Sequence, residues 1–277
     1  MPLRSLDTAT ELVHQISGPE DAPAMVYLPG VHGDWTANES ARTHLSRETR
    51  LIEVAYPRNA AWTLADFSNA LRRLLDRLNL TSVHVAGESF GSLVAWETAF
   101  GHPELIKSLL LVGGFAQPPA YRVATSAKWA LRGMPTFVLE TGIDIYVYYK
   151  DLKGERRLGR RSGVSPYPAV RTRKGKLATA SRMGIIERTD VRERLHRLQQ
   201  PVRYIGGDSD SVIGVHRELS TLRQHLPPHC EFKSELIQDA PHAIIASHPE
   251  HTARTLTRWI LDIEQSREAP RDDHPQG

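Results

Sequence analysis

The sequence is poor in cysteine. Cys230 is the only cysteine in 277 residues, and a single thiol forms no internal disulfide, so a protein of the reducing cytoplasm is predicted. One cysteine also argues against thiolate metal sites. The 13 histidines leave room for a histidine site, but the sequence lacks metal-binding spacings such as His-Glu-x-x-His. We therefore expect no metal.

Long apolar runs are also missing. No window approaches the roughly 20 apolar residues of a membrane-spanning helix, and the N-terminus lacks a basic stretch followed by an apolar run. We expect no stable membrane insertion and no export signal. The hydrophobic content of 40% suits one large α/β domain, or a core domain with an insertion.

Positive charge is unevenly distributed. Residues 150–203 hold 16 Lys and Arg against 5 Asp and Glu, a net charge of +11, and the rest of the chain is near −8. These basic residues are interpreted either as a solvated surface facing an acidic body or as a field that attracts an anionic substrate or partner. No nucleic-acid motif accompanies them, so no nucleic-acid partner is predicted.

Strand-like and helix-like segments alternate along most of the chain. Short apolar runs predict strands at residues 11–16, 24–30, 50–57, 82–87, 106–114, 201–207 and 230–237. Helical spacing of apolar residues predicts helices at 63–80, 89–100, 215–226 and 251–263. This alternation predicts an α/β fold with a mostly parallel central sheet and helices on both faces.

The alternation of strand-like and helix-like segments is interrupted between residues 115 and 200. We predict a core of residues 1–114 and 201–263, with an inserted helical segment at 115–200. Within the insertion, residues 120–133, 143–152 and 176–198 have helical patterns. The polar end, residues 264–277, is predicted to be a flexible C-terminal tail.

A Gly-Glu-Ser-Phe-Gly motif lies between a predicted strand and a predicted helix. It places Ser89 between Gly87 and Gly91. In a nucleophile elbow, glycines two residues either side relieve the crowding of a tight turn, and the serine hydroxyl projects above the sheet edge. The alternative is an incidental serine in an ordinary strand–turn–helix joint.

Acidic and basic side chains follow two later predicted strands. A nucleophilic serine needs a base, and that base needs an orienting carboxylate. Asp208 and Asp210 follow the strand at 201–207, and His242 follows the strand at 230–237. The carboxyl ends of parallel strands meet at one edge of a sheet, so these groups are expected near Ser89.

Together these motifs resemble those of the α/β-hydrolase superfamily, in its serine esterase and lipase branch. The resemblance implies Ser89 as nucleophile, His242 as base and Asp210 as acid, with Asp208 as the fallback acid. It implies an oxyanion hole from the backbone N–H groups of Val31 and Phe90, and it makes residues 115–200 a helical lid. No cofactor is needed for this chemistry.

The resemblance implies an enzyme, a serine hydrolase that cleaves a carboxylic ester of a small or medium acyl substrate through an acyl-enzyme. One alternative is a thioesterase or acyltransferase on an anionic carrier substrate. The other is a non-catalytic binding protein with the same fold. The sequence carries no indication of the oligomeric state.

Overall fold

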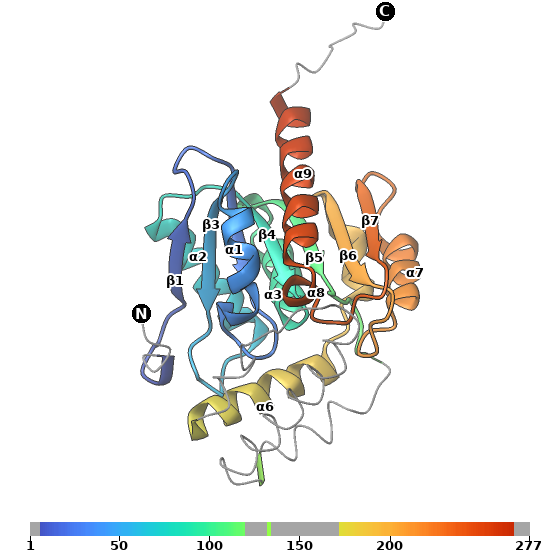
Figure 1. Ribbon diagram of the computed structural model, residues 1–277. Helices are drawn as coiled ribbons and strands as arrows, with labels where there is room; N and C mark the ends of the chain where they lie inside the picture. Colours follow the sequence, from blue (N-terminus) through green and yellow to red (C-terminus); the bar gives the residue numbers. More distant parts are fainter. Residues whose placement is uncertain (1–5, 120–131, 134–171, 269–277) are drawn as a thin grey trace, which may run out of the picture.

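A seven-stranded sheet forms the centre of the protein (Figure 1). The computed structural model describes residues 6–119, 132–133 and 172–268. The strands are β1 (Val13–Ser17), β2 (Ala24–Leu28), β3 (Arg50–Ala55), β4 (Val83–Glu88), β5 (Ile106–Val112), β6 (Val202–Gly207) and β7 (Phe232–Ile237). Their order across the sheet is β1-β3-β2-β4-β5-β6-β7.

The sheet is parallel except at one edge. β1 runs antiparallel to β3, and the other neighbours are parallel. Every residue of β4 and of β6 is buried, as expected for strands covered on both faces. The predicted mostly parallel α/β sheet is confirmed.

Helices cover both faces of the sheet (Figure 1). One buried apolar cluster holds side chains of α2 (Leu64–Arg77), α3 (Phe90–Gly101) and α7 (Val215–His225). A second cluster holds side chains of α1 (Glu39–Leu45), α8 (Ile244–Ser247) and α9 (Pro249–Glu268). The amphipathic pattern that predicted α2 also has a clear start, because Thr63 and Asp66 form a capping box.

The 3₁₀ segments η2 (Trp35–Asn38), η3 (Pro103–Leu105) and η5 (Arg192–Arg197) lie between these elements. Helix α6 (Arg173–Arg188) crosses the end of the sheet (Figure 1). The region predicted as helical at 176–198 is thus divided between α6, which ends at Arg188, and the short segment η5. The other predicted helices of the insertion lie almost entirely outside the described residues, and the lid stays a prediction. In the part of the chain that the structure describes, no helix has the length and apolar character needed to cross a membrane.

The boundary of the predicted C-terminal tail is wrong. Helix α9 continues past Ile263 to Glu268, because the carboxylate of Glu264 is held by two partners from the sheet. Lys107 Nζ donates to both Glu264 oxygens at 2.9 Å, and His84 Nε2 lies 3.0 Å from Oε1. Residues 269–277 lie outside the described residues.

His84 is a partnered histidine in the core. Its side chain is fully buried in β4, and Nδ1 lies 2.8 Å from the Ser108 hydroxyl. Burial, which outweighs the opposing attraction of Glu264, lowers the pKa of His84 from 6.5 to about 4. The neutral imidazole is therefore the form that the fold stabilises.

This burial predicts a loss of stability in acid. Between pH 6.5 and 4 the unfolded chain binds a proton at His84 that the folded chain does not, so the stabilisation present above pH 6.5 disappears as the pH falls toward 4. We expect wild type to lose about 3 kcal/mol more than a His84→Gln variant between pH 7 and pH 4. Urea unfolding across this pH range measures the difference, and equal pH dependence of the two proteins would contradict the assignment.

Candidate active site

Ser89 lies in a strained turn between β4 and α3. Its backbone has φ +49° and ψ −114°, a conformation that residues with a side chain rarely adopt. The Ser89 N–H donates to the Val112 carbonyl of β5 at 3.0 Å. Such a backbone costs about 1–3 kcal/mol and persists only where the surroundings enforce it.

The glycines of the motif make the turn possible. A Cβ on Gly87 would lie 2.7 Å from the Gly91 carbonyl oxygen, and a Cβ on Gly91 would lie 2.2 Å from that of Leu28. A side chain at Gly87 would push the start of α3 away from β4, and one at Gly91 would push it away from the end of β2. The result is a tight strand-to-helix turn of the shape expected for a nucleophile elbow.

His242 connects Ser89 to Asp210. Its Nε2 lies 2.9 Å from Ser89 Oγ, and its Nδ1 lies 2.7 Å from Asp210 Oδ2. The side chain of His242 is 23% exposed and that of Asp210 is fully buried, so the imidazole contacts solvent while the carboxylate does not. With Asp210 as a carboxylate acceptor, Nδ1 carries the proton and Nε2 is free to accept the Ser89 hydroxyl.

Two backbone amides hold the carboxylate of Asp210. Oδ1 accepts from the N–H groups of Val212 and Ile213, at 2.8 and 2.9 Å. Asp208, the fallback acid, is exposed and accepts from the hydroxyl of Ser209 instead. The structure therefore brings Asp210 to His242, and not Asp208.

Phe90 follows Ser89 directly, and the loop that contains Val31 approaches Ser89 at Gly30. Phe90 opens α3, and the first four N–H groups of a helix have no partner within it. The loop after β2 passes close by, because a Cβ on Gly30 would lie 3.6 Å from Ser89 Cβ. Val31 is the next residue of that loop.

Ser92 is a site residue that sequence reasoning missed. Its hydroxyl donates to the Ser89 carbonyl at 2.6 Å and accepts from the Phe115 N–H at 3.1 Å. It thus ties the elbow to the chain that follows β5. A serine in the first turn of a helix is common, so the sequence held no signal for this contact.

Glu88, inside the motif, faces the protein interior. It is buried, and its carboxylate accepts a hydrogen bond from the Tyr27 hydroxyl. Burial, together with this carboxylate, raises the pKa of Tyr27 well above its ordinary value. The contact assigns Glu88 to the packing of β2 against β4.

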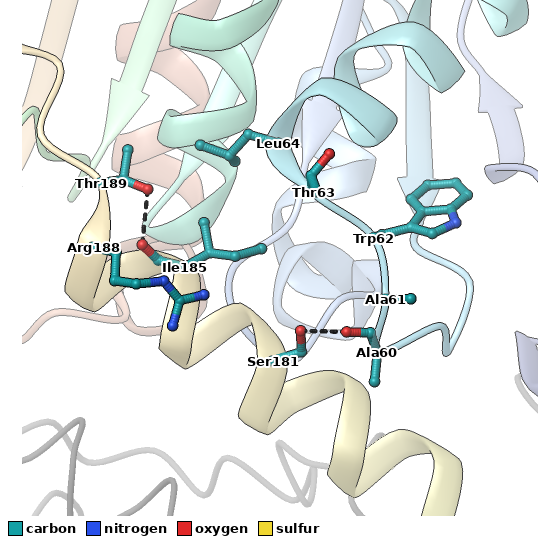
Figure 2. A pocket seen from close by; sticks show the side chains of 9 residues that line it. All are labelled: Ala60, Ala61, Trp62, Thr63, Leu64, Ser181, Ile185, Arg188 and Thr189. Carbon is teal, nitrogen blue, oxygen red and sulfur yellow. Dashed lines mark hydrogen bonds between the residues drawn. The ribbon is translucent and has the colours of Figure 1, made fainter.

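A cavity of about 340 Å³ lies between α6 and the loop before α2 (Figure 2). Trp62, Leu64 and Ile185 form much of its wall, with Arg188 at one side. None of Ser89, Asp210 and His242 lines it. Among the residues that the structure describes, no cluster of histidine, cysteine or carboxylate side chains is arranged to hold a metal ion.

A family described as the alpha/beta hydrolase fold matches residues 43–249. The chain belongs to this family. A pimeloyl-[acyl-carrier protein] methyl ester esterase of Methylococcus capsulatus is 27% identical over 88% of this chain and 95% of its own. A 3-oxoadipate enol-lactonase of Acinetobacter baylyi is 22% identical over 90% and 93%.

Solved structures have the same fold. The enol-lactonase of Burkholderia xenovorans superposes with a TM-score of 0.71 at 18% identity, over 92% of this chain and 96% of that one. The predicted family and fold class are thus confirmed.

The elbow geometry predicts a strong asymmetry between two glycines of α3. Gly91→Ala is expected to lower the free energy of unfolding by roughly 2–4 kcal/mol, because its Cβ meets the Leu28 carbonyl. Gly101→Ala, at the other end of the helix where a Cβ meets nothing within 4 Å, is the matched control. It is expected to change stability by less than about 1 kcal/mol. Similar urea midpoints for the two variants would contradict this packing.

Proposed function

We propose that Ser89, His242 and Asp210 form the catalytic triad of an ester hydrolase. The observation that carries the proposal is the continuous chain of hydrogen bonds from Asp210 through His242 to Ser89 Oγ. The serine at the end of that chain lies in a strained elbow at the start of α3. This combination activates a hydroxyl and exposes it to a substrate.

The proposed reaction proceeds through an acyl-enzyme. His242 Nε2 takes the hydroxyl proton as Ser89 Oγ attacks the ester carbonyl, and Asp210 stabilises the imidazolium that forms. The N–H groups of Val31 and Phe90 bind the oxyanion. His242 then protonates the leaving alcohol as the C–O bond breaks. Water, deprotonated by His242, next cleaves the acyl-enzyme and regenerates Ser89. No step requires a metal or an organic cofactor.

The ester-hydrolase class predicted from the sequence agrees with the relatives, which include a methyl ester esterase and an enol-lactonase. Both span nearly the whole chain. For this protein we propose a small-molecule carboxylic ester with a small or medium acyl group. Location in the cytoplasm stays a prediction.

A second substrate class is favoured by charge. The excess of Lys and Arg in residues 150–203 gives this segment a net charge of +11, and the name of one relative specifies an ester on an acyl-carrier protein. The alternative function is therefore a thioesterase or acyltransferase, in which the same triad cleaves the bond between an acyl group and its anionic carrier.

Triad substitutions test the proposed function. With p-nitrophenyl butyrate, Ser89→Ala and His242→Ala are expected to lower kcat by about 10⁴- to 10⁶-fold, and Asp210→Asn by about 10³- to 10⁴-fold. Asp208→Asn is the matched control and should retain wild-type activity. A fluorophosphonate probe should label wild type and not Ser89→Ala. Folded wild type that neither reacts with the probe nor hydrolyses esters would instead support a non-catalytic binding protein.

Salt separates the two substrate classes. If the basic segment captures an anionic carrier, kcat/KM for butyryl-coenzyme A should fall by roughly tenfold between 20 and 300 mM NaCl. The value for neutral p-nitrophenyl butyrate should change by less than about twofold over the same range. Steady-state rates with both substrates measure this, and equal salt responses would remove the carrier alternative.

A further inference from the structure

The loop that contains Val31 is held by hydrogen bonds to its backbone carbonyls. Five consecutive carbonyls, residues 29–33, each accept one. The donors are Tyr56 Oη to Pro29 (3.1 Å), Gly33 N to Gly30 (3.0 Å), Arg182 Nε to Val31 (2.7 Å), Arg182 Nη2 to His32 (3.2 Å) and Tyr56 N to Gly33 (2.8 Å). Since a trans peptide is planar, fixing the Gly30 carbonyl also fixes the opposite direction of the Val31 N–H. The direction in which the Val31 N–H points therefore depends on the hydrogen bonds that hold the loop.

Arg182 provides two of the five bonds from a distant element. It lies on α6, 151 positions beyond Val31, and only 2% of the residue is exposed. Its planar guanidinium presents several N–H groups in fixed directions. Two of these N–H groups donate to the carbonyls of Val31 and His32. The single ammonium group of a lysine would not hold both carbonyls with the same geometry.

The charge of Arg182 is kept inside the protein at a cost. Burial lowers the pKa of Arg182 to about 10, while Tyr56 and Asp34 act in the opposite direction. The guanidinium carbon lies 5.9 Å from the centre of the Tyr56 ring. An aliphatic side chain would anchor α6 without this desolvation penalty. The buried guanidinium is better explained by the carbonyls that it binds.

Gly33 leaves the space that Arg182 occupies. Its φ is +86°, and a Cβ at this position would lie 2.8 Å from Arg182 Nη2. Loop and side chain thus fit each other at the position where the loop turns.

We propose that Arg182 is a positioning residue for the oxyanion hole. Its guanidinium holds the carbonyls of Val31 and His32. Fixing the His32 carbonyl also fixes the Gly33 N–H of the same planar peptide, which donates to the Gly30 carbonyl. In this way Arg182 keeps the Val31 N–H directed at the oxyanion that forms on attack by Ser89. This inference rests on the proposed function. It gives one residue of α6, Arg182, a positioning role, although this side chain takes no part in proton transfer or bond formation.

Kinetics of Arg182→Met test the proposal. We expect kcat for p-nitrophenyl butyrate to fall by about 10- to 100-fold with KM within about twofold, because a misplaced donor weakens binding of the transition state alone. The affinity for an alkyl trifluoromethyl ketone, whose adduct with Ser89 carries an oxyanion, should fall by the same factor. Inhibition by butyrate, the product, should not change. Arg173→Met, at an exposed position of the same helix, is the matched control and should behave as wild type.

A conservative variant covers the case in which Arg182→Met does not fold. Arg182→Lys keeps the charge but brings one donor group instead of a fork, so an intermediate loss of kcat and of ketone affinity, about 3- to 10-fold, is expected. Wild-type kcat and ketone affinity in the folded Arg182 variants would overturn the proposal, as would a change in KM or melting temperature alone. Inactive wild type, with no labelling by fluorophosphonate, would instead contradict the proposed function.

Discussion

The left-handed backbone of Ser89 is the constraint on which the site depends. A serine with φ +49° is held only because its neighbours leave no other arrangement. Gly91 packs directly against the Leu28 carbonyl, so the helix start lies on the end of β2. Ser92 and Val112 then bond the carbonyl and the N–H of Ser89 itself. The strain is thus offset by packing that also brings the loop after β2 next to the serine.

The parallel sheet brings the rest of the site together. Ser89 follows β4, Asp210 follows β6 and His242 follows β7, and the carboxyl ends of these strands lie at one edge. Short loops after these strands are then enough to bring His242 within 2.7 Å of Asp210 and 2.9 Å of Ser89. Arg182 adds α6 to the same edge, so a helix from the predicted insertion contacts the loop nearest the serine.

Much of the fold followed from local patterns, and the exceptions have tertiary causes. Helix α1 was not predicted, because its short sequence has no strong apolar periodicity. It is held by packing on α9 and by the bond from Arg42 to the buried carboxylate of Glu53. Residues 264–268 have the polar composition of a tail, yet Glu264 is bound by Lys107 and His84. The packing of α1 on α9 and the bonds of Glu264 to Lys107 and His84 join positions more than 150 residues apart, and such contacts leave no periodic signal in the sequence.

The sequence by itself determined the family of this protein and the residue types of its candidate site. A serine between glycines at a strand–helix joint, followed by an acid and a histidine after later strands, restricts the fold to one in which those groups converge. Only the tertiary structure decided which aspartate faces the histidine, since Asp208 and Asp210 lie in one loop and differ in the direction of their side chains. It alone also revealed Arg182 on the carbonyls of Val31 and His32. The physical reason is that hydrogen bonds depend on direction and distance in space, which residue types and spacing along a chain do not specify.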